Sequence, residues 1–308
     1  MLSDSFQTSY VLVKPQDVKF ALRREKSEER AYYLGTAYGY CRGCLSDASK
    51  KGYLGVVKHL IREGADVHAN NDEALRWASK HGHLEVTQFL IWKGSNIHAC
   101  DDYALKWASE YGHLEVAKCL ILHGADVHSN NGVALRFASQ NGHLEVAKCL
   151  ILHGADVHTN NDEALISASK YGHLEVVKFL ILKGADVHAD YGAALGWASA
   201  YGRLEVVQYL ISKGADVHAG GDEALRWAST YGHLGVVKSL ISKGADVHAR
   251  SDEALRRTSM YGHLEVIKYL VESGADIHAN NDEAQKYASA YGQLEVAKFL
   301  EKQHTCRE

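Results

Sequence analysis

One sequence unit recurs every 30 residues along most of this chain, and the repeat limits the folds that are open to it. Glycine marks the unit at two places. The first glycine series runs from Gly52 to Gly292 and the second from Gly64 to Gly274, both in steps of 30 residues. A period of about 20–50 residues is typical of solenoids, in which each unit packs only against its neighbours. We therefore expect one continuous array, although 308 residues would otherwise suggest roughly two domains.

Each unit carries the signals of two short helices, as residues 160–184 illustrate. Asp162 is a favourable N-cap for the first helix, and Gly172 provides the left-handed residue that ends it. A second apolar face follows His173 and stops at Gly184. Helices of about 10 residues do not persist alone in water, so each pair must bury its apolar face against neighbouring pairs.

The second half of the unit resembles the second helix and turn of the ankyrin repeat. At residues 172–187 it reads Gly-His-Leu-Glu-Val-Val-Lys-Phe-Leu-Ile-Leu-Lys-Gly-Ala-Asp-Val. The resemblance implies an all-α ankyrin-repeat solenoid of nine stacked helix pairs with a 30-residue period. The copies are also similar to the expanded ankyrin repeat families of giant DNA viruses of amoebae, the mimivirus-like families. Helix pairs are expected at about 42–63, 72–93, 102–123, 132–153, 162–183, 192–213, 222–243, 252–273 and 282–303.

The unit departs from the ankyrin pattern in its length and in its opening motif. Its period is 30 residues, whereas the family's is about 33. The usual Thr-Pro-Leu-His is replaced by Glu73-Ala74-Leu75-Arg76 and its equivalents, which accounts for the single proline of the chain. Aligning both ends of the unit puts the deletion in the loop before the first helix, which in the family is a projecting β-hairpin. We therefore expect shortened, poorly formed hairpin loops.

The two ends of the chain do not follow the repeat. Residues 1–41 are expected to be an N-terminal non-repeat segment that caps the array 42–303, and residues 304–308 a short tail. Terminal repeats of a solenoid need a polar outer face, and the last pair meets this need with Gln285 and its charged end.

The repeat also argues against catalysis. Two series starting at His68 and His83 contain eight and six of the 19 histidines, whereas a catalytic histidine is normally one of a kind. The chain has no Gly-x-x-x-x-Gly-Lys-Ser/Thr, Gly-x-Gly-x-x-Gly or His-Glu-x-x-His motif. The pair Cys41 and Cys44 is alone, while a structural zinc site needs about four ligands. We predict no enzyme, no catalytic residue, no cofactor and no metal.

Histidines one repeat apart are too far from each other to share one zinc ion, whose nitrogen ligands lie about 2.0–2.1 Å from the metal. Turn hydrogen bonds are the expected role of the series that starts at His68. A second hypothesis is a pH-dependent binding surface, because histidines with an unperturbed pKa of about 6.5 gain charge between neutral and endosomal pH.

Composition and segment lengths favour a protein that is intracellular and cytoplasmic. No run of residues approaches the ~20 apolar residues of a membrane span, and the N-terminus lacks the basic-then-apolar pattern of a signal peptide. The net charge of −4 argues against a protein that coats nucleic acid through bulk charge. We expect a monomer that is not secreted and makes no membrane contact.

The resemblance places the first helices on the concave face of the stack, where their last turn commonly contacts a partner. Tyrosine gives a large contact area at low entropic cost, although tyrosine at this place is also frequent as a structural residue of ankyrin repeats. The tyrosines predicted to bind a partner are Tyr111, Tyr171, Tyr201, Tyr231, Tyr261 and Tyr291.

A basic column on the same helices includes Arg226 and Arg256, with Arg257 beside it. It is either a solvated face balanced by nearby acids or a surface for an acidic partner. The repeat consensus breaks most densely at residues 189–203 and again at Gly220, so we expect the partner footprint in this middle-to-late stretch. Neutral drift among redundant repeats is the alternative explanation.

The sequence therefore predicts a non-enzymatic protein–protein interaction scaffold that binds a protein or peptide on the concave face of an ankyrin stack. Its partner is a host protein if the chain is viral. The alternative is a binder of nucleic acid or another acidic polymer, because basic and aromatic residues alternate on the first helices. A third reading is an array in which repeat number matters more than any residue.

Overall fold

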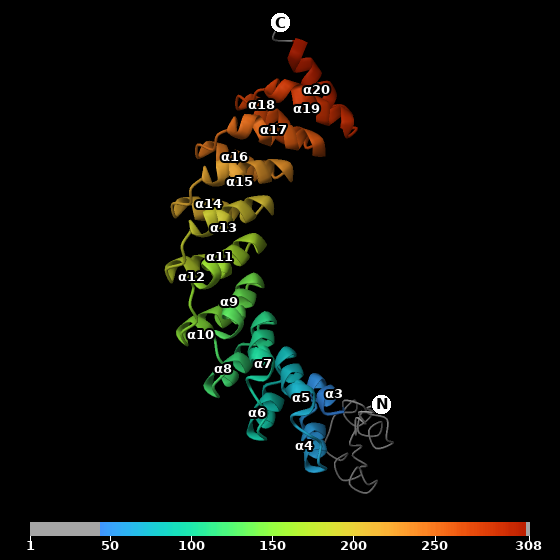
Figure 1. The fold of residues 1–308 in the computed structure, drawn as a ribbon, viewed down its shortest axis with the longest axis vertical. Coiled ribbons are helices and arrows are strands. Elements are labelled where there is room, and N and C mark those ends of the chain that lie inside the picture. The colour runs from blue at the N-terminus through green and yellow to red at the C-terminus, as the bar shows by residue number, and fades with distance from the viewer. Residues whose placement is uncertain (1–43, 306–308) are drawn as a thin grey trace, which may run out of the picture. The chain divides into compact units, whose positions relative to one another are not determined.

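The computed structural model describes residues 44–305, which fold into helices and contain no strand (Figure 1). The predicted all-α class is confirmed. The expected cap at residues 1–41 lies outside the described residues, as do residues 306–308 of the expected tail. The helices are α3 (Cys44–Lys51), α4 (Leu54–Arg62), α5 (Ala69–Lys80), α6 (Leu84–Trp92), α7 (Ala99–Glu110), α8 (Leu114–Leu122), α9 (Ser129–Gln140), α10 (Leu144–Leu152), α11 (Thr159–Tyr171), α12 (Leu174–Leu182), α13 (Ala189–Ala200), α14 (Leu204–Ser212), α15 (Ala219–Thr230), α16 (Leu234–Ser242), α17 (Ala249–Tyr261), α18 (Leu264–Glu272), α19 (Ala279–Ala290) and α20 (Leu294–Thr305).

The helices form nine pairs with the expected 30-residue period. Odd-numbered helices are the first of each pair and even-numbered helices the second. First helices pack on the first helices of neighbouring repeats, as α13 does on α15, and second helices pack on second helices, as α14 does on α16. The predicted solenoid of helix pairs is therefore confirmed.

The chain divides into two compact units inside the repeat array. The second unit begins at Val157 and also takes in Ser139–Leu144, the turn between α9 and α10; the first unit otherwise extends to Asp156. Helices α3 to α10 thus belong to the first unit apart from that turn, and α11 to α20 belong to the second.

Leucine forms the core of each unit because it recurs at one fixed place on the first helix and one on the second. Burying a leucine side chain contributes about 1.5–3 kcal/mol, so the series supplies a large part of the packing free energy. Alanines such as Ala78 and Ala198 have no exposed surface and let the first helices approach closely. The largest fully buried side chains are Leu75, Leu90, Leu105, Leu120, Leu135 and Leu150 in the first unit and Leu165, Leu180, Leu195, Leu210 and Leu225 in the second.

Three consecutive left-handed residues stand where the family has a hairpin. Asn70, Asn71 and Asp72 have φ angles of 54°, 57° and 55°, and the later repeats repeat this geometry. The left-handed conformation costs an ordinary L-residue roughly 1–2 kcal/mol, and Asn, Asp and Gly tolerate it best. These three residue types occupy most of the positions concerned. The expected shortening of the hairpin loops is confirmed, and within residues 44–305 no strand pair is left.

The aspartate of this turn was expected to cap its own helix, and that expectation is wrong. Asp162 has a φ of 59° instead of the extended conformation of an N-cap. Its buried carboxylate accepts the backbone N–H of Asp186 in the following repeat at 2.9 Å. Asp222 accepts the N–H of Asp246 in the same way at 2.8 Å. The aspartate therefore joins neighbouring repeats.

The histidine four residues earlier holds that carboxylate. Nδ1 of His218 lies 3.2 Å from Oδ1 of Asp222, and His248 and Asp252 form the same contact at 3.1 Å. A ring that donates from Nδ1 leaves the second lone pair of the carboxylate oxygen for the next repeat. The hydrogen-bonding role expected for this histidine series is thus present, with an aspartate side chain as the acceptor.

Most members of the second histidine series tie their repeat to the one before it. Nε2 of His113 donates to the carbonyl of Lys80 at 2.9 Å, 33 residues back. Carbonyls in the last turn of a helix have no partner within it, so this donor completes the end of α5. Arg203 makes the equivalent bond at 3.2 Å and Gln293 at 3.3 Å. The position therefore requires a long side chain with a donor and tolerates more than one type.

Candidate functional site

The six predicted tyrosines lie at the ends of the first helices and are exposed to solvent. Their exposed fractions range from 38% at Tyr171 to 57% at Tyr291. Tyr111 belongs to the first unit and the other five to the second. The rings of Tyr171 and Tyr201 are near neighbours, with centroids 6.4 Å apart. The structure therefore presents the tyrosines at a surface and does not bury them in the core.

A tryptophan one helical turn earlier extends this aromatic surface. Trp197 lies 6.1 Å from Tyr201, and Trp227 lies 5.7 Å from Tyr231 with the two rings nearly parallel. Trp197 is itself 44% exposed. Residues four apart share one face of a helix, which is why these pairs form.

Two lysines lie over these aromatic rings. The ammonium of Lys170 lies 4.5 Å from the centroid of Trp197 and 5.1 Å from that of Tyr201. Lys80 makes the same kind of contact in the first unit. A cation within about 6 Å of a ring centroid is attracted by the ring's quadrupole. Sequence reasoning missed this contact, and its signal was a lysine 27 residues before a tryptophan, as in Lys80 and Trp107 or Lys170 and Trp197.

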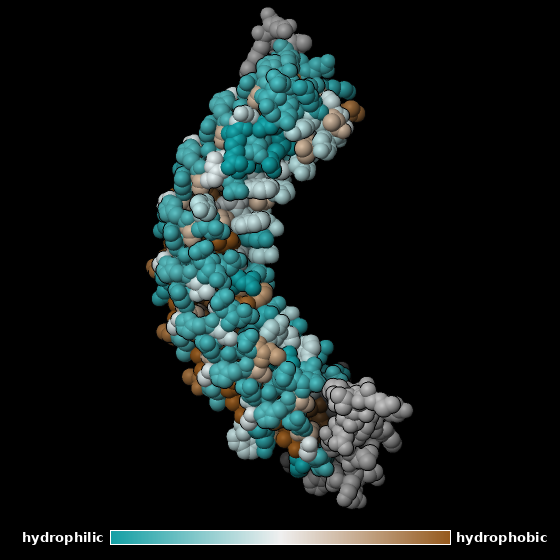
Figure 2. All heavy atoms as spheres, viewed as in Figure 1, coloured by the Kyte–Doolittle hydropathy of each residue, from teal (hydrophilic) through white to brown (hydrophobic). Residues whose placement is uncertain are grey.

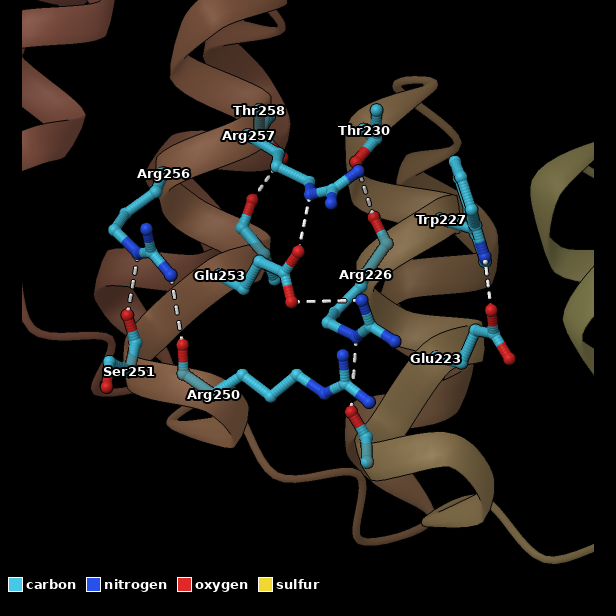
Figure 3. A network of polar contacts seen from close by, with 12 residues as sticks. Glu223, Arg226, Trp227, Thr230, Arg250, Ser251, Glu253, Arg256, Arg257 and Thr258 are labelled. Carbon is cyan, nitrogen blue, oxygen red and sulfur yellow. Dashed lines mark hydrogen bonds and ion pairs between the residues drawn. The ribbon is translucent and has the colours of Figure 1, made fainter.

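Arg226 and Arg256 connect neighbouring first helices, while Arg257 pairs within its own helix. Nη1 of Arg226, on α15, lies 2.9 Å from Glu253 on α17, and Nε of Arg257 lies 2.6 Å from the other oxygen of Glu253. Figure 3 shows the two guanidinium groups meeting at this carboxylate. Arg256 pairs with Glu283 on α19. Arg226 is only 7% exposed, so its charge serves the junction between repeats.

The basic column also completes the left-handed turns. Arg226 donates from Nε and Nη2 to the carbonyls of Gly221 and Gly220, both at 3.2 Å. Arg256 donates in the same way to Ser251 at 2.8 Å and to Arg250 at 3.0 Å (Figure 3). The left-handed turn exposes carbonyls that its own helix cannot satisfy, and a long basic side chain one turn later reaches them.

Glu283 is the most perturbed carboxyl group at these junctions. Its pKa is lowered from 4.5 to about 2, first by the hydroxyl of Tyr287 and then by the amide of Asn280 and the guanidinium of Arg256. Tyr287 donates at 2.6 Å and Asn280 at 2.7 Å. All three donors favour the ionised carboxylate.

An exposed apolar column on the second helices was missed in the sequence. Trp92, Leu122 and Leu152 in the first unit, and Leu182 in the second, are between 72% and 83% exposed. Figure 2 shows hydrophobic surface over α8, α10 and α12. The signal was a leucine at a fixed place of the repeat where later repeats have serine, as at Ser212. Exposed apolar clusters of this kind often mark interaction sites.

One group of side chains in residues 44–305 has the spacing of a metal site. The possible ligand atoms of His278, Asp282 and His304 all lie within 4.8 Å of one another. His278 and Asp282 form the recurring pair at 2.8 Å, and the long last helix brings His304 to within 3.3 Å of the same oxygen. The bond from His278 lowers the pKa of Asp282. Imidazole and carboxylate ligands suit a transition metal, while the absence of a metal stays a prediction from the sequence.

Comparison with known families is decisive at this point. A family model described as "Ankyrin repeats (3 copies)" matches residues 45–131, 130–191, 189–251 and 225–307, which together span most of the chain. The chain belongs to the ankyrin repeat family. No curated protein matches it. The similarity to families of giant DNA viruses therefore stays a prediction.

Ankyrin repeats generally mediate protein–protein interaction, and ankyrin repeat proteins are typically non-enzymatic. In the part of the chain that the structure describes, no helix is long and apolar enough to cross a membrane. Interaction with another protein is therefore the general role that membership of the ankyrin repeat family indicates for this chain.

Proposed function

We propose that this ankyrin array is a non-enzymatic interaction scaffold that binds a protein or peptide through its first-helix face. By first-helix face we mean, in each unit, the exposed ends of the first helices that carry the tyrosines. The observation that supports this proposal is the exposure of a tyrosine at the same place of α7, α11, α13, α15, α17 and α19. From the resemblance to ankyrin repeats we expect this face to lie on the concave side.

The surface is ordered before any partner arrives. The aromatic rings stand on helices whose ends are fixed by bonds between repeats, such as that from Arg203 to the carbonyl of Lys170. Ring contacts such as that between Trp227 and Tyr231 restrict the side chains further. A partner therefore loses little binding free energy to the ordering of this face, and aromatic residues are the commonest energetic centres of interfaces.

Fewer unpaired arginine side chains are available to bind an acidic polymer than the sequence indicates. Arg226, Arg256 and Arg257 bind carboxylates of their own chain. A polyanion would have to displace these carboxylates before it could contact the arginines. The acidic-polymer alternative, the cytoplasmic location, the monomeric state and a host protein as partner all stay predictions.

Selection from a displayed library of random peptides tests the proposal. The full chain is immobilised and compared with a Tyr201→Ala/Tyr231→Ala/Tyr261→Ala variant, after circular dichroism has shown equal helicity. Residues at the centre of an interface contribute about 1–2 kcal/mol each. We expect the peptides that are enriched on the wild-type chain to lose at least about tenfold of their enrichment on this variant.

The matched control removes three apolar side chains from the second helices, as Trp92→Ala/Leu122→Ala/Leu152→Ala. These side chains are more exposed than the tyrosines. If removing any exposed apolar surface lowered peptide enrichment, the control would therefore lose enrichment as well. Enrichment that survives the tyrosine changes, or that disappears in the control alone, would assign binding to the second helices. No enrichment above empty resin would contradict the scaffold function.

A further inference from the structure

A lysine in the last turn of a first helix is surrounded by aromatic rings from two repeats. The ammonium of Lys80 lies 5.0 Å from the centroid of Trp77 in its own repeat. In the following repeat it lies 4.7 Å from Trp107 and 5.1 Å from Tyr111. The chain itself thus shows that aromatic side chains at these three places accommodate an alkylammonium group.

One tryptophan of this column can serve two cations. Trp77 contacts Lys50 of the preceding repeat at 4.7 Å as well as Lys80 of its own repeat at 5.0 Å. In the second unit, Trp197 contacts Lys170 of the preceding repeat at 4.5 Å. By the same register, a second cation would lie over Trp197 from the position of residue 200.

Residue 200 is alanine, but aromatic residues stand around it at the places that correspond to those around Lys80. Ala200 and Trp197 lie on α13, which packs against α15. Trp227 and Tyr231 on α15 occupy the places that Trp107 and Tyr111 occupy around a lysine in the first unit. Trp197 and Tyr231 are 44% and 51% exposed and Ala200 is 6% exposed, so solvent reaches the two outer rings but hardly the alanine itself.

A carboxylate at the same junction lacks the arginine that Glu253 and Glu283 bind. Oε1 of Glu223 accepts the indole N–H of Trp227 at 2.9 Å, and Figure 3 shows the two side chains facing each other. The equivalent Glu253 is also paired with Arg226 of the preceding first helix. For Glu223 that preceding position is Gly196, where an added Cβ would meet nothing within 4 Å. Within the described residues, no cation pairs with Glu223.

Arg257, in the following repeat, does not take the place over Trp227 that Lys80 takes over Trp107 in the first unit. The guanidinium of Arg257 lies 5.8 Å from the centroid of Trp227, near the outer limit of a cation–π contact. Its Nε is bound to Glu253 at 2.6 Å. Arg257 also comes from α17, which packs on α15 from the repeat that follows, whereas Ala200 belongs to the repeat before.

We propose that Trp197, Trp227, Tyr231 and Glu223 form a cage for the alkylammonium group of a lysine side chain from a partner protein. Three aromatic rings would surround the ammonium, as they do around Lys80, and the carboxylate of Glu223 supplies the opposite charge. The proposal deepens the interaction function, since it names the side chain that the first-helix face takes at the junction of α13 and α15. It also accounts for both the absence of a lysine at residue 200 and the open space at Gly196.

Nuclear magnetic resonance of the full chain, labelled with ¹⁵N only in its five tryptophans, tests the cage one indole at a time. The probe is Nα-acetyl-lysine amide, and its matched control is the norleucine analogue, which has the same stem without the charge. We expect the lysine probe to shift the indole signals of Trp197 and Trp227. The signals of Trp77 and Trp107, whose cage already holds Lys80, should stay in place. Loss of the charge should weaken binding by about 5- to 30-fold.

The variant Ala200→Lys fills the cage with the chain's own lysine and leaves every aromatic residue in place. We expect it to abolish the shifts at Trp197 and Trp227. Ala290→Lys makes the same change at the same place of the last repeat and should leave the shifts unchanged. Equal shifts with the norleucine analogue, shifts spread over all five indoles, or full binding by Ala200→Lys would overturn the proposal.

These outcomes are independent of the peptide selection. A cage that binds the lysine probe in a chain that selects no peptides would retain the site and contradict the scaffold function. Peptides that need the tyrosines but show no preference for lysine would retain the function and contradict the cage.

Discussion

At the scale of single residues, the glycine series that starts at Gly52 is explained largely by contact with the histidine series that starts at His83. Gly82 ends α5 with a φ of +75°, and an added Cβ there would lie 2.5 Å from Nδ1 of His113. The same ring donates to the carbonyl of Lys80. Glycine is thus needed for two reasons, the left-handed backbone and the room for the ring. Gly94 has a similar φ of +94° but would meet nothing within 4 Å.

These two glycines permit a direct comparison within the first unit. Gly94→Ala should cost only the penalty of the left-handed conformation, about 1 kcal/mol of unfolding free energy. Gly82→Ala should cost about 2–3 kcal/mol, because the imidazole must move and its hydrogen bond is lost as well. Urea unfolding followed by circular dichroism measures both values. Equal costs for the two substitutions would show that the contact with His113 contributes nothing.

Residue positions were more predictable from the sequence than residue roles. The period places Asp162 in the turn before a first helix and Arg226 on a first helix, as the structure does. The sequence pattern also predicts that Asp162 caps its own helix, and it does not. In the structure its carboxylate binds a backbone N–H 24 residues later, in another repeat. Such a bond depends on how two repeats pack and on three left-handed residues in a row, neither of which a local pattern contains. The same limitation hid the ion pair of Arg226 with Glu253.

At the scale of helices, charged side chains connect first helices that meet mainly through small residues. The junction of α17 and α19 depends on Glu283, which binds Arg256 from one helix and Tyr287 from its own. The lowered pKa of Glu283 means that the folded chain holds this carboxylate ionised more strongly than the unfolded chain does. The contribution of Glu283 to stability is therefore fully present above its ordinary pKa of 4.5 and is lost as the pH falls towards 2.

We predict that Glu283→Gln destabilises the chain at pH 7 by about 1 kcal/mol, a value typical of a partly exposed ion pair. The difference in unfolding free energy from the wild-type chain should shrink steadily between pH 4.5 and pH 2.5, because Glu283 is then protonated in the unfolded wild-type chain while the folded chain still holds it ionised. Urea titrations of both proteins at several pH values measure this difference, in which the titration of the other carboxyl groups cancels. A difference that stays constant with pH would remove Glu283 from the pH dependence.

At the scale of the whole molecule, the repeat predicts the fold, and the exceptions to the repeat contribute to the proposed binding site. The period, the glycines and the leucines predict the helix pairs, because each acts within a unit or between neighbouring units. Two exceptions, at Gly196 and Gly220, and the alanine at the variable position 200 fall within 25 residues and involve the same two helices, α13 and α15. The sequence indicated this stretch as a footprint. It could not indicate the aromatic rings around Ala200, because only the contacts of Lys80 and Lys170 show that a lysine at this variable position lies over the rings of the next repeat.

The central claim is that a partner binds the first-helix face of the second unit, and hydroxyl-radical footprinting tests it most directly. Aromatic side chains on both faces are oxidised and measured by mass spectrometry, with and without the most enriched peptide of the selection. We predict lower oxidation of Tyr201, Tyr231 and Trp197 in the complex, while Trp92 on the second helices keeps its full reactivity. Protection of Trp92 with unchanged oxidation of both tyrosines would contradict the account.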